Sequence, residues 1–183
     1  MRFVFDERKA AEAAALLLER HGGTMAYIKL IKLLYLADRQ ALIQTGRTIT
    51  GDRMVSMDHG PVLSQVYDCH KSGLAEGGPW QEYISPPSNY DVTLLASPKL
   101  RALSPYEVEL VENVFKQFGH LRKWDLVDYM HTLPEWENPH GSALPIDARV
   151  ILREAGKSDE EIEHIAAEVE ALHAFKALAA GRS

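Results

Sequence analysis

The single cysteine of the chain, Cys69, is followed directly by His70 and is the first candidate for nucleophilic chemistry. A cysteine nucleophile needs a base within hydrogen-bond reach of its sulfur. Neighbouring side chains on a helix project about 100° apart, so this pair does not form a dyad. An isolated cysteine is more often an unreactive core residue. We therefore expect no enzyme activity, with a small hydrolase as the alternative.

Histidines and carboxylates that could bind a metal ion gather in two parts of the chain. They are His59, His70, His131 and His140, together with Asp58, Asp68 and Glu135. Zinc sites usually show two ligands at a short, regular spacing, and Pro134 should end the helix that would align His131 with Glu135. Signature loops for nucleotide or zinc-protease chemistry are absent. We expect ordinary hydrogen-bonded histidines, with no metal and no other cofactor.

The string Asp58-His59-Gly60-Pro61 is the most unusual local motif. Proline is favoured at the first position of a helix, so the string predicts a helix that starts at Gly60-Pro61. The free N–H groups of such a start attract a carboxylate, either that of Asp58 or one from a partner. A simple junction between strand and helix explains the string without a ligand, and we favour this interpretation because Gly-Pro alone accounts for the geometry.

Charged residues surround the end of a long apolar segment. They are Asp38, Arg39, Arg47, Asp52 and Arg53. One interpretation is a surface salt-bridge network that contributes little stability. The other is a partly buried pair that fixes residues 48–57.

Four aromatic residues in loop-rich segments are candidate anchors for a protein partner. They are Trp80, Tyr83, Tyr90 and Trp136. Aromatic side chains dominate the binding energy of many interfaces. The alternative is that they fold back over the core.

Helical patterns fill most of the chain. Asp6 should cap a helix to about Arg20, ended by Gly22-Gly23. Thr24 should cap a second helix that runs to Gly46, and the apolar residues of this helix cover most of its circumference, which indicates a buried central helix. Further helices are expected from Gly60 to Gly73 and over residues 104–119, 121–132 and 147–155. A final helix should begin at Ser158, with an apolar stripe of Ile162, Ile165, Val169, Leu172 and Leu178.

The remaining segments predict minor β structure. Residues 48–57 are typical of short strands or extended arms, residues 91–95 of another short strand, and residues 73–98 of an exposed, irregular arm. The predicted fold class is mainly α with minor β: a compact bundle of about six to seven helices around the buried central helix, with a few short strands.

Composition bounds the class of partner. The chain has 183 residues, 46% of them hydrophobic, and a formal net charge of -6. Nucleic-acid binding depends on basic residues that neutralise phosphates, so nucleic acid is an unexpected partner, and a DNA-binding regulator is kept only as an alternative. The lone cysteine and the lack of a long apolar segment predict a cytoplasmic protein without a membrane partner.

Four blocks in order resemble the Panacea domain, also called the SocA-like antitoxin domain. They are residues 29–39, residues 46–52, residues 58–62 with the following Val66-Tyr67, and residues 131–136, and the resemblance extends over residues 8–138. It implies one domain over residues 1–183, in which residues 147–183 form a C-terminal helical extension.

The resemblance also implies a function. Members bind an unrelated protein toxin directly and neutralise it, and the type member delivers its toxin to the ClpXP protease. We therefore expect a cognate toxin, and in addition ClpX, as partners. The candidate partner-binding residues are Asp38, Arg53, Asp58, His59, Gly60, Pro61, Trp80 and Trp136.

Overall fold

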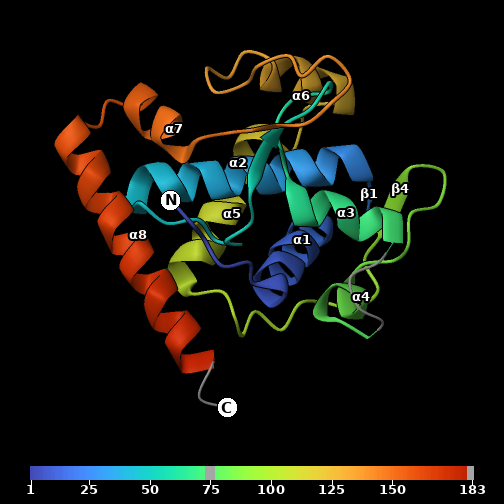
Figure 1. Ribbon diagram of the computed structural model, residues 1–183. Helices are drawn as coiled ribbons and strands as arrows, with labels where there is room; N and C mark the ends of the chain where they lie inside the picture. The colour runs from blue at the N-terminus through green and yellow to red at the C-terminus, as the bar shows by residue number, and fades with distance from the viewer. Residues whose placement is uncertain (73–76, 181–183) are drawn as a thin grey trace.

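Helix α2 (Tyr27–Thr45) runs through the middle of the protein, and other helices surround it (Figure 1). The computed structural model describes residues 1–72 and 77–180. Apolar residues on every side of α2 are buried, and Leu30, Leu33 and Leu34 have no exposed surface. The prediction of a buried central helix is confirmed.

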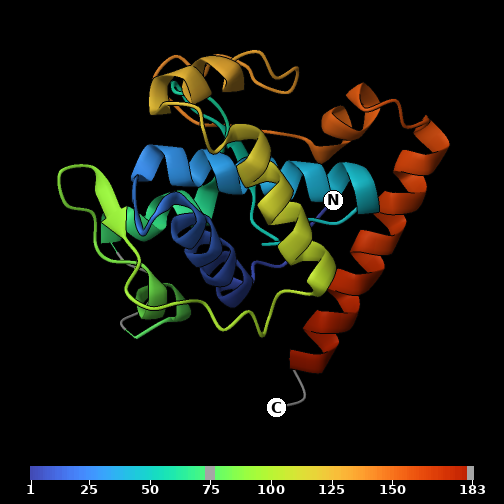
Figure 2. The ribbon, with the colours of Figure 1, turned by 180° about the vertical axis from the view of Figure 1, so that it is seen from behind.

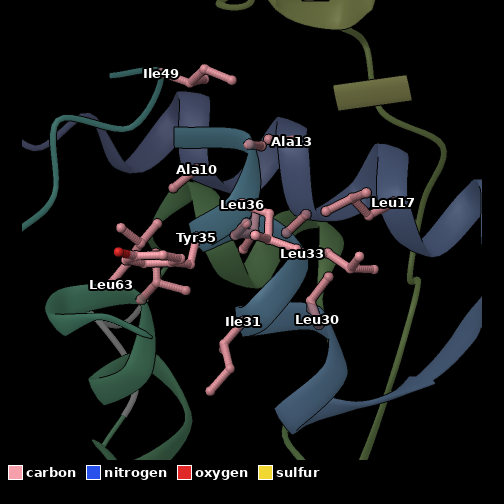
Figure 3. Packing of buried hydrophobic residues seen from close by; sticks show 14 of the residues in the cluster. Ala10, Ala13, Leu17, Leu30, Ile31, Leu33, Tyr35, Leu36, Ile49 and Leu63 are labelled. Atoms are coloured by element: carbon pink, nitrogen blue, oxygen red, sulfur yellow. The ribbon is translucent and has the colours of Figure 1, made fainter. Parts of the chain in front are cut away.

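Helices α1 (Glu7–His21) and α5 (Pro105–Phe118) pack on α2 and on each other. The buried side of α1 is rich in alanine, and small side chains allow neighbouring helices to approach closely. Figure 3 shows Ala13 and Leu17 of α1 gathered with Leu33 and Leu36 of α2. Helices α6 (Lys123–Met130) and α7 (Ala148–Glu154) complete the cover of α2.

Two small antiparallel sheets join the connecting segments. Strand β1 (Thr24–Ala26) pairs with β4 (Asp91–Thr93). Strand β2 (Met54–Ser56) lies between β3 (Val62–Leu63) and β5 (Leu144–Pro145). The predicted class, mainly α with a few short strands, is confirmed, with eight helices in the described part of the chain.

Local capping signals are confirmed at several helix ends. The Asp6 side chain accepts a hydrogen bond from the backbone of Lys9, and Gly46 ends α2 with φ 72°. Ser104 and Glu107 form the predicted capping box of α5. These signals act within four residues, which explains why they can be recognised in the sequence.

Two local predictions are wrong. Thr24 belongs to β1, so α2 begins at Tyr27 without a side-chain cap. Gly60-Pro61 precedes β3, so helix α3 (Ser64–Ser72) begins three residues after Pro61. In each case a contact with a distant segment overrides the local preference. The expected helix stop at Gly73 lies outside the described residues.

The segment after α3 is less exposed than predicted. Helix α4 (Pro79–Tyr83) packs on α1, and it buries Trp80 and Tyr83. Strand β4 confirms the expected strand near residues 91–95, and the loop that leads into β4, with Tyr90 84% exposed, projects from the body (Figure 1).

Helix α8 (Asp159–Ala180) is partly packed. Ile162 and Val169 are buried, whereas Leu172 and Leu178 lie exposed, so the predicted stripe is inward-facing over its first half only. Among the described residues, no helix combines the length and apolar character needed to cross a membrane.

Candidate functional site

The carboxylate of Asp38 fixes the segment that follows α2. It is fully buried, and it accepts hydrogen bonds from the backbone N–H groups of Ile49 and Thr50, both at 2.9 Å, and from the Thr50 hydroxyl. Burial raises the pKa of Asp38 to about 7, while the hydrogen bonds oppose that rise. Asp38 therefore holds the fold in place and has no surface available to a partner.

Asp52 closes the N-terminus of α3. Its carboxylate accepts hydrogen bonds from the backbone N–H groups of Gln65 at 3.1 Å and Val66 at 2.9 Å. Burial raises its pKa. A carboxylate from this chain already occupies the helix start, which leaves no such place for a partner's carboxylate.

The charged residues near the end of α2 do not form the predicted surface network. Among the described residues, Asp38 and Asp52 bond to backbone N–H groups, and Arg39 pairs with Glu135 instead. Arg53 is exposed, and its guanidinium donates a hydrogen bond to the Ser64 hydroxyl at 3.5 Å.

Lys32 of α2 holds the Asp58–Pro61 turn. Its ammonium Nζ donates hydrogen bonds to the carbonyl oxygens of Gly60 at 2.9 Å and Pro61 at 2.8 Å. The turn also receives a hydrogen bond from the Gly141 N–H to the Asp58 carboxylate, at 2.9 Å. Desolvation lowers the pKa of Lys32 to about 7. The Asp58–Pro61 string is thus a junction fixed by a buried cation.

Gly60 adopts φ 89°, a conformation that favours glycine. A β-carbon at this position would lie 2.8 Å from Cβ of Met130. We expect Gly60→Ala to lower the free energy of unfolding by about 1–3 kcal/mol, measured by urea denaturation. Gly77→Ala is a suitable control for positive φ alone, because no atom of the described residues lies within 4 Å of its added carbon. Equal losses in the two variants would contradict the steric argument.

Glu135 links the last of the four motif blocks, residues 131–136, to helix α2. Its carboxylate accepts hydrogen bonds from the Tyr35 hydroxyl at 2.8 Å and from Arg39 Nε at 2.7 Å. The Glu135 side chain has no exposed surface. This cluster fixes the residues after α6 on the central helix.

The side chains of Trp136 and Trp80 make contacts within the fold, so neither is well placed to bind a partner. The Trp136 indole donates a hydrogen bond to the carbonyl of Met57 at 3.0 Å and packs on the His131 ring at 4.3 Å between centroids. Trp80 is 4% exposed and belongs to the core. For Trp80, the structure favours the alternative in which the ring folds back over the core.

A half-open groove of about 920 Å³ lies at the end of α2 nearest β1 and β4, beside the Asp58–Pro61 turn. Its lining combines many apolar and aromatic side chains with a few polar ones. The lining residues are Ala26, Tyr27, Ile28, Ile31, Lys32, Met57, Asp58, His59, Val62, Tyr67, Pro87, Asn89, Tyr90, Lys123 and Trp124. This volume and composition are typical of sites that accept a ligand or a partner's side chains.

Two exposed aromatic residues stand at the groove, Tyr90 at 84% exposure and Trp124 at 52%. The Trp124 ring makes an edge contact with His59, at 5.6 Å between centroids. Sequence reasoning named Tyr90 and His59 but missed Trp124 and Lys32. A signal existed for Trp124, because Leu126, Val127 and Met130 define the buried side of α6 and Trp124 lies outside that set.

The candidates for chemistry do not assemble into one site. Cys69 is buried, its thiol donates a hydrogen bond to the Gln65 carbonyl, and burial raises its pKa to about 12. His131 Nε2 lies 3.0 Å from the Asp58 carbonyl oxygen. Within the described ranges, no three His, Cys, Asp or Glu residues form a group suited to a metal ion. The His70 side chain lies outside the described part.

A family model, described as antitoxin SocA-like, Panacea domain, matches residues 30–137. That range contains the buried Asp38, Asp52 and Glu135, the Asp58–Pro61 turn with Lys32, and most of the groove. No curated protein and no solved structure matches the chain.

Proposed function

The chain belongs to the SocA-like antitoxin family with the Panacea domain, and from that premise we propose that it binds a cognate protein toxin directly and neutralises it. The observation that carries the proposal is the groove with Tyr90 and Trp124 exposed beside it. Large exposed aromatic residues next to a concave apolar surface are typical of the centre of a protein interface.

The surroundings of the groove support a preformed binding surface. Lys32 fixes the turn on one side, and the pairing of β1 with β4 fixes the base of the Tyr90 loop on the other. A surface that is ordered before binding loses less conformational entropy when the partner arrives. Asp58, His59, Tyr90 and Trp124 are therefore the proposed contact residues. Trp136 bonds to Met57 of the groove lining and helps to position it, whereas Asp38 and Trp80 are buried in other parts of the fold.

Trp124→Ala is expected to weaken toxin binding at least tenfold, because truncation of a central interface aromatic costs about 1.4 kcal/mol or more. The test is co-expression with the product of the adjacent gene, with growth as the readout, followed by titration calorimetry of the purified pair. Tyr106→Ala is the matched control: Tyr106 is also exposed, but it bonds to Gln44 at the other end of α2.

Two results would count against the proposed function. An adjacent gene product that is harmless alone, or toxic despite this protein, would contradict neutralisation. Equal weakening by Trp124→Ala and Tyr106→Ala would contradict the groove as the binding surface.

We propose a binding role without enzymatic activity. The support is that Cys69, the single cysteine of the chain, has a buried thiol whose raised pKa disfavours the reactive thiolate. Its environment is that of an inert core residue. We expect the protein to work in the cytoplasm, where a lone cysteine stays reduced.

Delivery of the toxin to ClpXP is a further activity that we propose from the family relationship. An adaptor needs a second surface, and the end of α8 that carries the exposed Phe175 and Leu178 lies on the opposite side from the Tyr90 loop (Figure 2). Toxin degradation by purified ClpXP should accelerate when the protein is added. An unchanged rate would leave neutralisation by binding alone.

A further inference from the structure

The groove is lined by a buried lysine, Lys32, that forms no ion pair with any described residue. Its side chain is 1% exposed, and desolvation lowers its pKa. Asp58 also lines the groove, but its carboxylate bonds to the Gly141 N–H and makes no ion pair with Lys32 among the described residues. Buried charges are normally paired, because desolvation costs several kcal/mol.

The hydrogen bonds of Lys32 leave one of its donors without an acceptor among the described residues. An ammonium group has three N–H donors, and the described residues accept two of them, through the Gly60 and Pro61 carbonyls. Lys29 offers a comparison on the same helix. It is also buried, and it bonds to the Gly119 carbonyl at 2.7 Å, but it lies outside the groove lining.

We infer that the groove receives an acidic side chain of the partner protein, flanked by apolar residues, and that the Lys32 ammonium binds its carboxylate. This inference rests on the proposed function and specifies which part of a toxin the groove recognises. Tyr90 and Trp124 would cover the flanking apolar residues, and the carboxylate would supply the charge that Lys32 lacks. A buried, charge-assisted pair of this kind gives both affinity and selectivity.

A matched pair of peptides tests the inference without the toxin. The probes are acetyl-Leu-Phe-Glu-Leu-Phe-amide and its twin with glutamine in place of glutamate, titrated at pH 6.5 while the Trp124 indole resonance is followed by NMR. We expect the glutamate peptide to bind at least tenfold more tightly. Lys32→Met should reduce that ratio to about one, whereas Lys29→Met should preserve it.

The pH dependence gives an independent readout. The pKa of Lys32 is about 7 in the free protein, so binding of a carboxylate above pH 7 requires uptake of a proton. Affinity for the glutamate peptide should therefore fall about tenfold between pH 7.5 and 8.5. Lys32→Arg should remove that fall, because a guanidinium stays charged.

Other titratable groups near Lys32 have to be separated from it. They are Tyr27 on α2, Asp58 and His59 in the turn, Tyr67 on α3, and Lys123 and His131 around α6. His59→Gln should leave the loss of affinity above pH 7.5 unchanged. If the pH dependence disappears with His59 instead, Lys32 is not the group that binds the carboxylate.

Several outcomes overturn the inference. They are equal binding of the two peptides to the unmodified protein, a preference that survives Lys32→Met, or no binding of the glutamate peptide at millimolar concentration. Binding of free 4-phenylbutyrate without binding of the peptide would assign the site to a small carboxylic acid. A different result would separate the inference from the proposed function. If Trp124→Ala abolishes toxin neutralisation while Lys32→Met preserves it, the proposed function stands and the role of Lys32 is disproved.

Discussion

Replacement of Asp38 by leucine is expected to lower the free energy of unfolding by about 3–5 kcal/mol. The variant leaves the N–H groups of Ile49 and Thr50 and the Thr50 hydroxyl without their buried acceptor. Each unsatisfied buried donor costs about 1–3 kcal/mol. Urea denaturation followed by circular dichroism measures the loss, and a loss below 1 kcal/mol would contradict the assigned role of Asp38.

Asp38→Asn is the matched control, because its amide oxygen can accept the same two backbone hydrogen bonds. It also isolates the effect of charge. The pKa of Asp38 is raised from 3.8 to about 7 in the folded protein, so between these pH values the folded state binds the proton more tightly than the unfolded state. The stabilising contribution is complete below about pH 4 and is lost as the pH rises through 7.

The stability of the unmodified protein relative to Asp38→Asn should therefore decrease from pH 4 to pH 7. Thermal unfolding of both proteins across this range provides the comparison. Parallel pH profiles would show that Asp38 does not titrate in that window.

Glu135→Ala is the second variant for which we expect a loss of about 3–5 kcal/mol. Removal of one partner from a buried ion pair leaves the other charge uncompensated. Here the Arg39 guanidinium and the Tyr35 hydroxyl both lose their acceptor, and the truncation creates a cavity next to α2. Urea denaturation is again the measurement.

Asp125→Asn is the control for the effect of burial on an ion pair. It removes the exposed pair between Arg122 and Asp125, and exposed pairs of this kind contribute little because water and salt screen them. We expect no measurable change in its unfolding midpoint. If Asp125→Asn and Glu135→Ala were equally destabilising, burial would not be the reason for the effect at Glu135.

Much of the helical framework could be predicted because its signals are local. The Asp6 cap, the Ser104–Glu107 capping box and the Gly46 stop each depend on residues within one helical turn. The apolar circumference of residues 27–45 was enough to identify a buried central helix. The predicted helix starts at Thr24 and at Gly60-Pro61 are wrong because contacts with distant segments override the local preference. Thr24 pairs with β4, and Gly60-Pro61 precedes β3 and is held by Lys32.

The candidate site depended on contacts between distant segments. Trp80, proposed as an exposed anchor, is buried where α4 packs on α1, while Trp124, not considered, is exposed at the groove. Hydropathy and residue type are the same for the two tryptophans, so neither property distinguishes them. The buried side of each helix distinguishes them: α4 packs Trp80 against α1, whereas Trp124 lies outside the buried set of Leu126, Val127 and Met130 on α6.

The sequence by itself determined the helical class, the central position of α2 and, through ordered motif blocks, the resemblance to an antitoxin domain. The tertiary structure alone decided what those motifs do: Asp38, Asp52 and Glu135 bind segments of the same chain, and Lys32 holds the Asp58–Pro61 turn in the lining of a groove. The physical reason is distance along the chain. Helix caps act over three or four residues, whereas the Tyr35–Glu135 hydrogen bond joins residues 100 positions apart, a contact that only packing creates.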